Sequence, residues 1–165
     1  VTVSPVPTKA VTYITKGKAE TIKFPRVKNS KADLWSSSEP DVAEVVGSGP
    51  KMNGKVTAKA WGTSDITCSY NGILFETTVC AEDPLTVFDG KEYTDNNGKA
   101  DMTVGEIKQF GIKNIHQTAN YKSSKPKVVF IDENGCVYAR SKGQAVISTK
   151  VNNKTYKIKI TVKEN

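Results

Sequence analysis

The sequence has no long apolar run: no segment approaches the roughly 20 consecutive apolar residues that a membrane-spanning helix needs. We therefore expect no membrane insertion of this chain. Cysteine is scarce as well. Cys68, Cys80 and Cys136 are too few and too scattered for a disulfide scaffold, and they lack the closely spaced pairs that bind zinc. They are interpreted as three free thiols, and no metal site is expected.

Side chains suited to catalysis are also rare. The single histidine, His116, lies in the polar segment Lys113–Gln117, where no motif predicts a nucleophile or a group that would hold it as a base. The segment Tyr93–Gly98 is a poor match to a calcium-binding loop, because tyrosine stands where an aspartate ligand belongs. We expect a non-catalytic protein without a cofactor, in which His116 is a surface residue and Tyr93–Gly98 is a polar turn.

The sequence does contain the pattern of short strands. Near the C-terminus, apolar and polar residues alternate with a period of two, as in a strand with one buried and one exposed face: Tyr156, Ile158, Ile160 and Val162 alternate with Lys157, Lys159, Thr161 and Lys163. Many turn signals separate such segments and no helical period is found, which predicts an all-β sandwich. Val1–Val3 and Leu85–Val87 are expected to be opening strands.

A hairpin is predicted at Asn71–Gly72, because this pair suits a two-residue turn in which both positions need a positive φ. Apolar side chains then fall mostly on one face, which supports the register. In that register Cys80 lies opposite Thr63, on the other face from Cys68, so these two cysteines cannot form a disulfide. The predicted pairs are Cys68 with Phe75, Ile66 with Thr77 and Ser64 with Val79.

One phrase occurs twice in the chain: Trp35-Ser-Ser-Ser-Glu-Pro40 aligns with Tyr121-Lys-Ser-Ser-Lys-Pro126. The match continues from Gly54-Lys-Val-Thr-Ala58 to Gly135-Cys-Val-Tyr-Ala139 and on to the last strand of each half. Such similarity indicates a duplicated domain. We predict domains 1–83 and 84–165, in which Trp35 and Tyr121 are core anchors and Ser-Ser-x-Pro makes the turn before the next strand.

Each copy closely resembles the bacterial immunoglobulin-like (Ig-like) domain of group 2, through the ordered pattern aromatic-x-Ser-Ser-x-Pro-x-Val, Gly-x-Val-x-Ala, Gly-x-x-x-Ile and a closing hairpin. The resemblance covers residues 17–81 and 105–162. It implies two tandem Ig-like β-sandwiches, here joined by the very short link Ala81–Pro84, in a protein that is secreted or displayed on a bacterial surface. Intimin- and invasin-type adhesins, multidomain glycan-active enzymes and phage structural proteins contain such domains, so the fold does not determine the function.

Positive charge gathers in the second half, which holds 14 Lys or Arg against 8 Asp or Glu, whereas residues 1–83 hold 10 against 9. The strand pattern points several lysines outward, and such a face could hold an anionic glycan or a cell wall. The alternative is that the lysines keep an exposed strand from pairing with other chains. Nucleic acid is not expected, because no aromatic residues interleave with the lysines. The candidate binding residues are Lys150, Lys154, Lys157, Lys159 and Lys163.

Trp61 is a further candidate, because it precedes a turn glycine at a position where the second copy has Lys142. Its ring could stack on a sugar, contact a neighbouring domain or pack partly on its own domain. The expected function is adhesion, display or spacing by a monomeric part of a larger surface protein, with a host-surface protein or an anionic glycan as partner. The alternatives are an accessory carbohydrate- or wall-binding module of an enzyme and a phage or appendage subunit.

Overall fold

A computed structural model describes residues 6–24, 34–48, 53–70 and 72–165. The chain divides into two compact units, one that ends at Asp83 and one that begins at Pro84. In the described ranges all regular structure is β-strand, and no helix capable of crossing a bilayer occurs there. Val1–Val3, expected to be a strand, lies outside the described residues.

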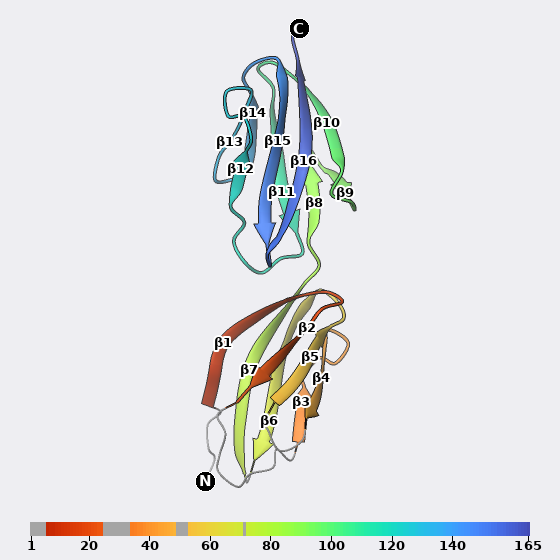
Figure 1. Cartoon of the computed structure of the whole chain (residues 1–165), viewed down its shortest axis with the longest axis vertical. Helices are drawn as coiled ribbons and strands as arrows, with labels where there is room; N and C mark the ends of the chain where they lie inside the picture. Colours follow the sequence, from red (N-terminus) through yellow and green to blue (C-terminus); the bar gives the residue numbers. More distant parts are fainter. Residues whose placement is uncertain (1–5, 25–33, 49–52, 71) are drawn as a thin grey trace. The chain divides into compact units, whose positions relative to one another are not determined.

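The first unit is a sandwich of two sheets, with strand orders β1-β7-β6-β3 and β2-β5-β4 (Figure 1). The first strand, β1, pairs with the last strand, β7, in parallel. All other pairs in this unit are antiparallel. The strands are β1 (Val6–Thr15), β2 (Ala19–Lys23), β3 (Leu34–Ser37), β4 (Ala43–Ser48), β5 (Asn53–Ala58), β6 (Gly62–Tyr70) and β7 (Ile73–Glu82).

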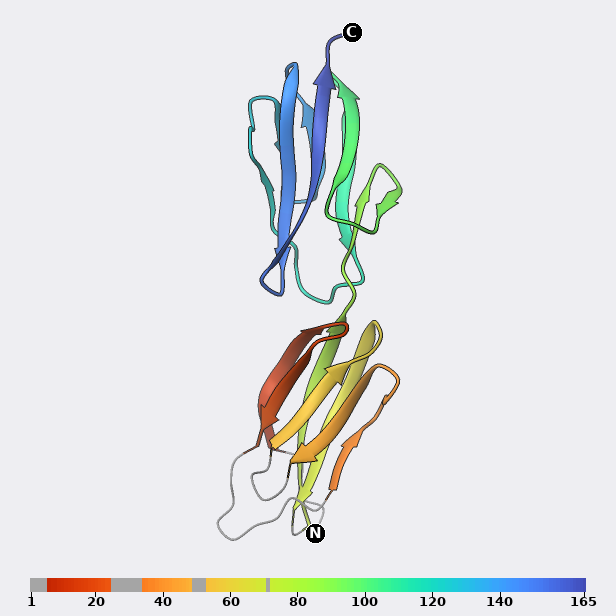
Figure 2. The same cartoon turned by 45° about the vertical axis from the view of Figure 1, so that its right-hand side comes forward.

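The second unit repeats this plan, with sheets β10-β16-β15-β12 and β13-β14-β11-β8-β9. Here β10 pairs with the last strand, β16, in parallel, and both views place β16 between β10 and β15 (Figures 1 and 2). The strands are β8 (Leu85–Phe88), β9 (Lys91–Tyr93), β10 (Gly98–Thr103), β11 (Ile107–Lys113), β12 (Tyr121–Ser123), β13 (Val129–Ile131), β14 (Cys136–Ala139), β15 (Gly143–Val151) and β16 (Lys154–Lys163).

The predicted hairpin register is confirmed. β6 and β7 pair Ser64 with Val79, Ile66 with Thr77 and Cys68 with Phe75. Gly72 has a φ of 75°, which the turn requires and glycine adopts at no steric cost. Cys80 lies opposite Thr63 as predicted, and all three cysteines are free thiols.

The repeated Ser-Ser phrase forms the same hydrogen bonds in both units. The Ser37 hydroxyl donates to the Ala43 carbonyl, and the Ser123 hydroxyl donates to the Val129 carbonyl. The next serine of each copy accepts from a strand amide, Asp65 N to Ser38 Oγ at 2.9 Å and Val146 N to Ser124 Oγ at 2.8 Å. The phrase therefore ties the turn to two strands, because each hydroxyl satisfies a backbone group that the turn leaves unpaired.

The two aromatic residues of the phrase pack on separate cores. In the first unit the Trp35 indole stacks on Phe24 with a 5.2 Å centroid distance, and Phe24 stacks on Phe75 at 5.6 Å. In the second, Phe110 meets Tyr121 edge-on at 5.5 Å. Both phrase aromatics are half-buried, and each lies against the cluster of buried hydrophobic side chains of its own unit.

Trp35 is accommodated by two glycines in the opposite sheet. Gly47 on β4 and Gly54 on β5 are cross-strand partners. A Cβ at Gly47 would lie 2.2 Å from Trp35 Cδ1, and one at Gly54 would lie 2.5 Å from Trp35 Cζ3. The indole therefore occupies the space that side chains on this pair would fill, which is one reason for glycine inside a strand.

Candidate functional site

The outer face of the sheet β10-β16-β15 carries most of the candidate lysines. On β16 the buried side chains of Tyr156, Ile158, Ile160 and Val162 alternate with exposed Lys157, Lys159 and Lys163, as the period-two pattern predicts. We call the outward side chains of β10, β15 and β16 the lysine face. Since β16 is an interior strand of this sheet, protection of a free edge does not account for Lys157 and Lys159.

A third lysine joins them from a distant part of the sequence. The parallel pairing of β10 with β16 sets Lys99 beside Lys159. Neighbouring strands lie only about 4.8 Å apart, and like charges directly opposite each other destabilise a sheet. Among the described residues, no ion pair links Lys99, Lys157 or Lys159 to a carboxylate.

The segment before β10 is attached to β16 through one side chain. The Lys157 backbone amide donates to Asn96 Oδ1 at 2.9 Å, and the Asn96 amide nitrogen donates to the Thr155 carbonyl. Asn97 N donates to Asp95 Oδ1 at 3.2 Å, which closes a small turn. Asn96 thus acts in place of a strand residue, and the turn is fixed at the edge of the lysine face.

These elements enclose a surface pocket of about 300 Å³, which we call the lysine pocket. Its charged lining groups are three ammonium groups, and Val146 of β15 supplies apolar surface. No carboxylate belongs to the lining. The lining residues are Asn96, Asn97, Gly98, Lys99, Val146, Lys157 and Lys159.

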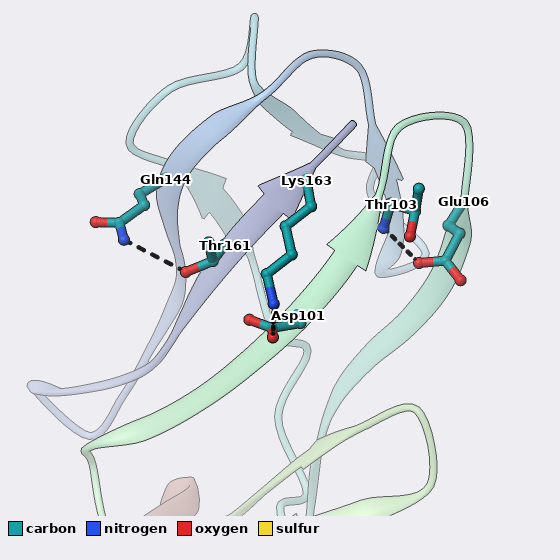
Figure 3. A network of polar contacts seen from close by, with 6 residues as sticks. All are labelled: Asp101, Thr103, Glu106, Gln144, Thr161 and Lys163. Atoms are coloured by element: carbon teal, nitrogen blue, oxygen red, sulfur yellow. Dashed lines mark hydrogen bonds and ion pairs between the residues drawn. The ribbon is translucent and has the colours of Figure 1, made fainter. Parts of the chain in front are cut away.

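Charges at the C-terminal end of the lysine face are paired (Figure 3). Lys163 Nζ lies 2.6 Å from Asp101 Oδ2, and the Gln144 amide donates to the Thr161 hydroxyl at 3.4 Å. Thr103 N donates to Glu106 Oε2 at 2.6 Å in the adjoining turn. Because Lys163 holds Asp101, the carboxylate that β10 contributes to this face is already engaged. Among the described residues of this face, the lysines without an ion pair are Lys99, Lys157 and Lys159, which lie together, and Lys150.

The structure places the remaining candidates apart from this cluster. Lys150 is exposed on the lysine face opposite Thr155, beyond Lys157 along the hairpin. Lys154 is exposed at the start of β16, but it alternates in step with Tyr156 rather than with Lys157, and its ammonium lies 5.1 Å from the centroid of the Tyr156 ring. Trp61 lies in the first unit, in the bend between β5 and β6, with 41% of its surface exposed. It belongs to a different unit from the lysines.

The same face in the first unit has different chemistry. By strand pairing, Asp65 and Thr78 correspond to Val146 and Lys159, and Glu76 corresponds to Lys157. The Thr78 hydroxyl donates to Asp65 Oδ1 at 2.9 Å. The sandwich therefore forms without lysines at these positions, so the fold does not require the charge of the second unit.

Other reactive groups are dispersed. His116 is exposed, Cys68 and Cys80 are buried, and Cys136 is half-buried with its thiol 3.5 Å from Gln109 Oε1. Within the part of the chain that the structure describes, no three His, Cys, Asp or Glu side chains are grouped as a metal site would need.

Sequence reasoning did not find Lys99, Asn96 or Val146. The two residues from the β10 region reach β16 across about 60 positions, and the contact depends on parallel pairing that no local pattern reveals. One signal was present in the sequence. The second copy carries an insertion at 95–98 relative to the first, and this insertion is the segment that forms the pocket wall.

Comparison with known proteins bears on the fold. Residues 117–164 match a family described as Big-like, bacterial Ig-like domain, and this range contains β12 to β16. The resemblance to bacterial Ig-like domains is thus confirmed for this part of the second unit. No curated protein sequence matches the chain.

Among solved structures, the C-terminal 282-residue fragment of intimin, in complex with the intimin-binding domain of the translocated intimin receptor, has a TM-score of 0.54 and 14% identity. The match covers 87% of this chain and 56% of that fragment, so the chain spans little more than half of its length. Invasin, described as a bacterial integrin-binding protein, matches with a TM-score of 0.40 and 13% identity, over 87% of this chain and 31% of invasin. Domains 5–6 of the S-layer protein SbsC match with a TM-score of 0.38 and 14% identity, over 96% of this chain and 95% of that one. The likeness to intimin confirms the all-β, Ig-like sandwich.

Proposed function

We propose that this chain is a non-catalytic module of two Ig-like domains of group 2, residues 1–83 and 84–165, and that it acts in adhesion, display or spacing. It would be a monomeric part of a larger bacterial protein that is secreted or held on the cell surface. The observation that carries the proposal is the separation of the two hydrophobic cores. Each cluster of buried side chains is drawn from one unit alone.

Self-contained cores suit a module whose task is mechanical or adhesive. A unit that buries its own apolar surface can be added to a chain without changes to its neighbours. The intimin fragment, which has the same fold, is recorded in complex with a receptor domain. That partner is a property of intimin. It supports here a partner of the same general kind, a protein on the surface of a host cell.

Adhesion is tested with the whole chain coupled to fluorescent beads through a C-terminal biotin. If the chain is an adhesin, beads are retained on host epithelial cells several-fold above albumin-coated beads, and soluble chain competes for the retention. Retention equal to that of albumin beads would reject adhesion to those cells. Display and spacing would then be tested by placing the chain between a bead and a known binding domain, where it should leave the affinity of that domain unchanged.

One observation favours a second candidate, an accessory carbohydrate- or cell-wall-binding module. The lysine pocket gathers three positive charges from two strands without an acidic residue in its lining. Trp61, half-exposed in the first unit, is an additional candidate for sugar stacking. The two candidates differ in what the chain binds: beads carrying an accessory module would be retained on purified walls rather than on host cells.

A further inference from the structure

The lysine pocket carries electrostatic strain that the fold does not relieve. Lys99 and Lys159 are direct neighbours on adjacent strands, and Lys157 lies two residues from Lys159 on the same face. The carboxylate available on β10, Asp101, is held by Lys163 at 2.6 Å. A bound anion would offset the mutual repulsion of the three ammonium groups. Because this repulsion is already present in the unbound protein, its relief on binding adds to the affinity for the anion.

Two comparisons within the molecule separate this pocket from ordinary surface charge. First, the lysines on β16 occupy an interior strand, where they do not guard an edge. Second, the matching face of the first unit has Glu76 and Asp65 where the second has Lys157 and Val146. The same scaffold thus forms with the opposite charge, and the positive cluster is particular to the second unit.

The pocket is also constructed from a segment that is an insertion when the sequences of the two halves are aligned. The insertion at 95–98 is fixed to β16 by the two hydrogen bonds of Asn96, to Lys157 N and to the Thr155 carbonyl. Because the oxygen and the nitrogen of the Asn96 amide both bond to the backbone of β16, this side chain shapes the wall of the pocket. The lysines are the groups that would contact a ligand. The wall therefore holds its position before any ligand arrives.

We propose that the lysine pocket binds a phosphate group carried on a polyol or sugar polymer. Three lysines line it, and lysine binds phosphate as a point charge, without the fixed bidentate geometry of an arginine fork. Val146 offers apolar surface to the carbon backbone of the polymer. Lys150, further along the same face, is placed to meet a second phosphate.

The occupant is a carbohydrate or polyol polymer rather than a nucleic acid. Unstacked bases need aromatic platforms, and no aromatic side chain belongs to the lining of the pocket. This inference is independent of the adhesive role proposed above. The pocket would hold such a polymer whether the module adheres, displays or spaces, and the test below uses purified polymer, so failure here leaves the bead assay on host cells unaffected.

The test is a calorimetric titration of the whole chain with purified poly(glycerol phosphate) at low and at moderate salt, with backbone amide NMR shifts to locate the contact. The variant is Lys157→Glu with Lys159→Glu. The control is Lys125→Glu with Lys127→Glu, which makes the same change of charge at two exposed residues in a turn of the same unit. Circular dichroism confirms that both variants are folded.

We expect the parent chain to bind, with shifts centred on Lys99, Val146 and Lys157, and with weaker binding as salt rises. The pocket variant should bind at least about tenfold more weakly, because it loses two of its three ion contacts with the phosphate and gains two carboxylates that repel it. The control variant should stay within about twofold of the parent.

Four results would overturn the proposal. An equal loss in the two variants would mean that net charge, rather than the pocket, attracts the polymer. Polygalacturonate bound as tightly as the phosphate polymer would remove the preference for phosphate. If double-stranded DNA bound as tightly as the phosphate polymer, the pocket would not select a polyol or sugar polymer. If poly(glycerol phosphate) did not bind at low salt, the proposed ligand would be wrong.

Discussion

Replacing Gly54 by alanine tests how Trp35 is accommodated in the first unit. The new Cβ would lie 2.5 Å from Trp35 Cζ3, whereas an ordinary contact is 3.4–4 Å. The indole would have to move by about 1 Å. Its other neighbour is Phe24, stacked at 5.2 Å, and Phe24 is in turn stacked on Phe75, so the whole aromatic row must shift.

The magnitude follows from two opposing effects. Overpacking of this kind costs about 1–3 kcal/mol. Loss of glycine's freedom in the unfolded chain returns about 0.4–1 kcal/mol, because the backbone at Gly54 is not in the positive-φ region. We therefore expect Gly54→Ala to lower the free energy of unfolding of the first unit by about 1–2 kcal/mol.

Tryptophan fluorescence during urea denaturation is a selective assay, because both tryptophans, Trp35 and Trp61, belong to the first unit. The control is Gly111→Ala on β11, where a Cβ meets nothing within 4 Å. Because β11 belongs to the second unit, this variant is followed by far-ultraviolet circular dichroism, and its stability should be unchanged or slightly raised. In a Trp35→Leu background the steric conflict is gone, so Gly54→Ala should become neutral or stabilising while Trp61 still reports unfolding. If the loss of stability persists without the indole, the explanation by overpacking is wrong.

Two further predictions concern stability and thiol chemistry. Ser123→Ala should lower the unfolding free energy of the second unit by about 1 kcal/mol, since the hydroxyl that donates to the Val129 carbonyl is lost; an unchanged urea midpoint by far-ultraviolet circular dichroism would contradict this. Burial, and secondarily the Glu82 carboxylate, raises the pKa of the Cys80 thiol, so a thiol reagent at pH 8 should modify Cys136 well before Cys80. Because the pKa of Cys80 is higher in the folded than in the unfolded state, its protonated thiol contributes to the free energy of unfolding fully below the ordinary thiol pKa, and this contribution is lost as pH rises through the folded value. Cys80→Ser should therefore weaken the fall of the unfolding free energy at alkaline pH, and an identical fall in the variant would refute the argument.

The parts of the fold that depend on local sequence were predictable. Asn71–Gly72 determined the β6–β7 register to the residue, because turn geometry and the burial of alternate side chains agree. The outward direction of Lys157 and Lys159 followed from alternation alone. Both predictions needed only neighbours along the chain.

The pocket itself was not predictable in the same way. Its composition depends on which strand lies beside β16, and β10 contributes Lys99 through a pairing between segments far apart in sequence. The sequence also left open whether the lysines guard an edge, a question that only the strand order answers. Lys154 shows that residues close in sequence need not share a face. It precedes Lys157 by three residues, yet it alternates in step with Tyr156 and its ammonium lies near that ring.

The parallel pairing of β1 with β7 has a mechanical consequence for the first unit. In the described part of this unit β1 is the first strand and β7 the last, and the two are neighbours that run in the same direction. Tension applied to the two ends therefore pulls them past each other along their length. The hydrogen bonds between the two strands are then loaded simultaneously, in shear, instead of breaking one at a time from one end. Such a unit is suited to carrying load along the polypeptide.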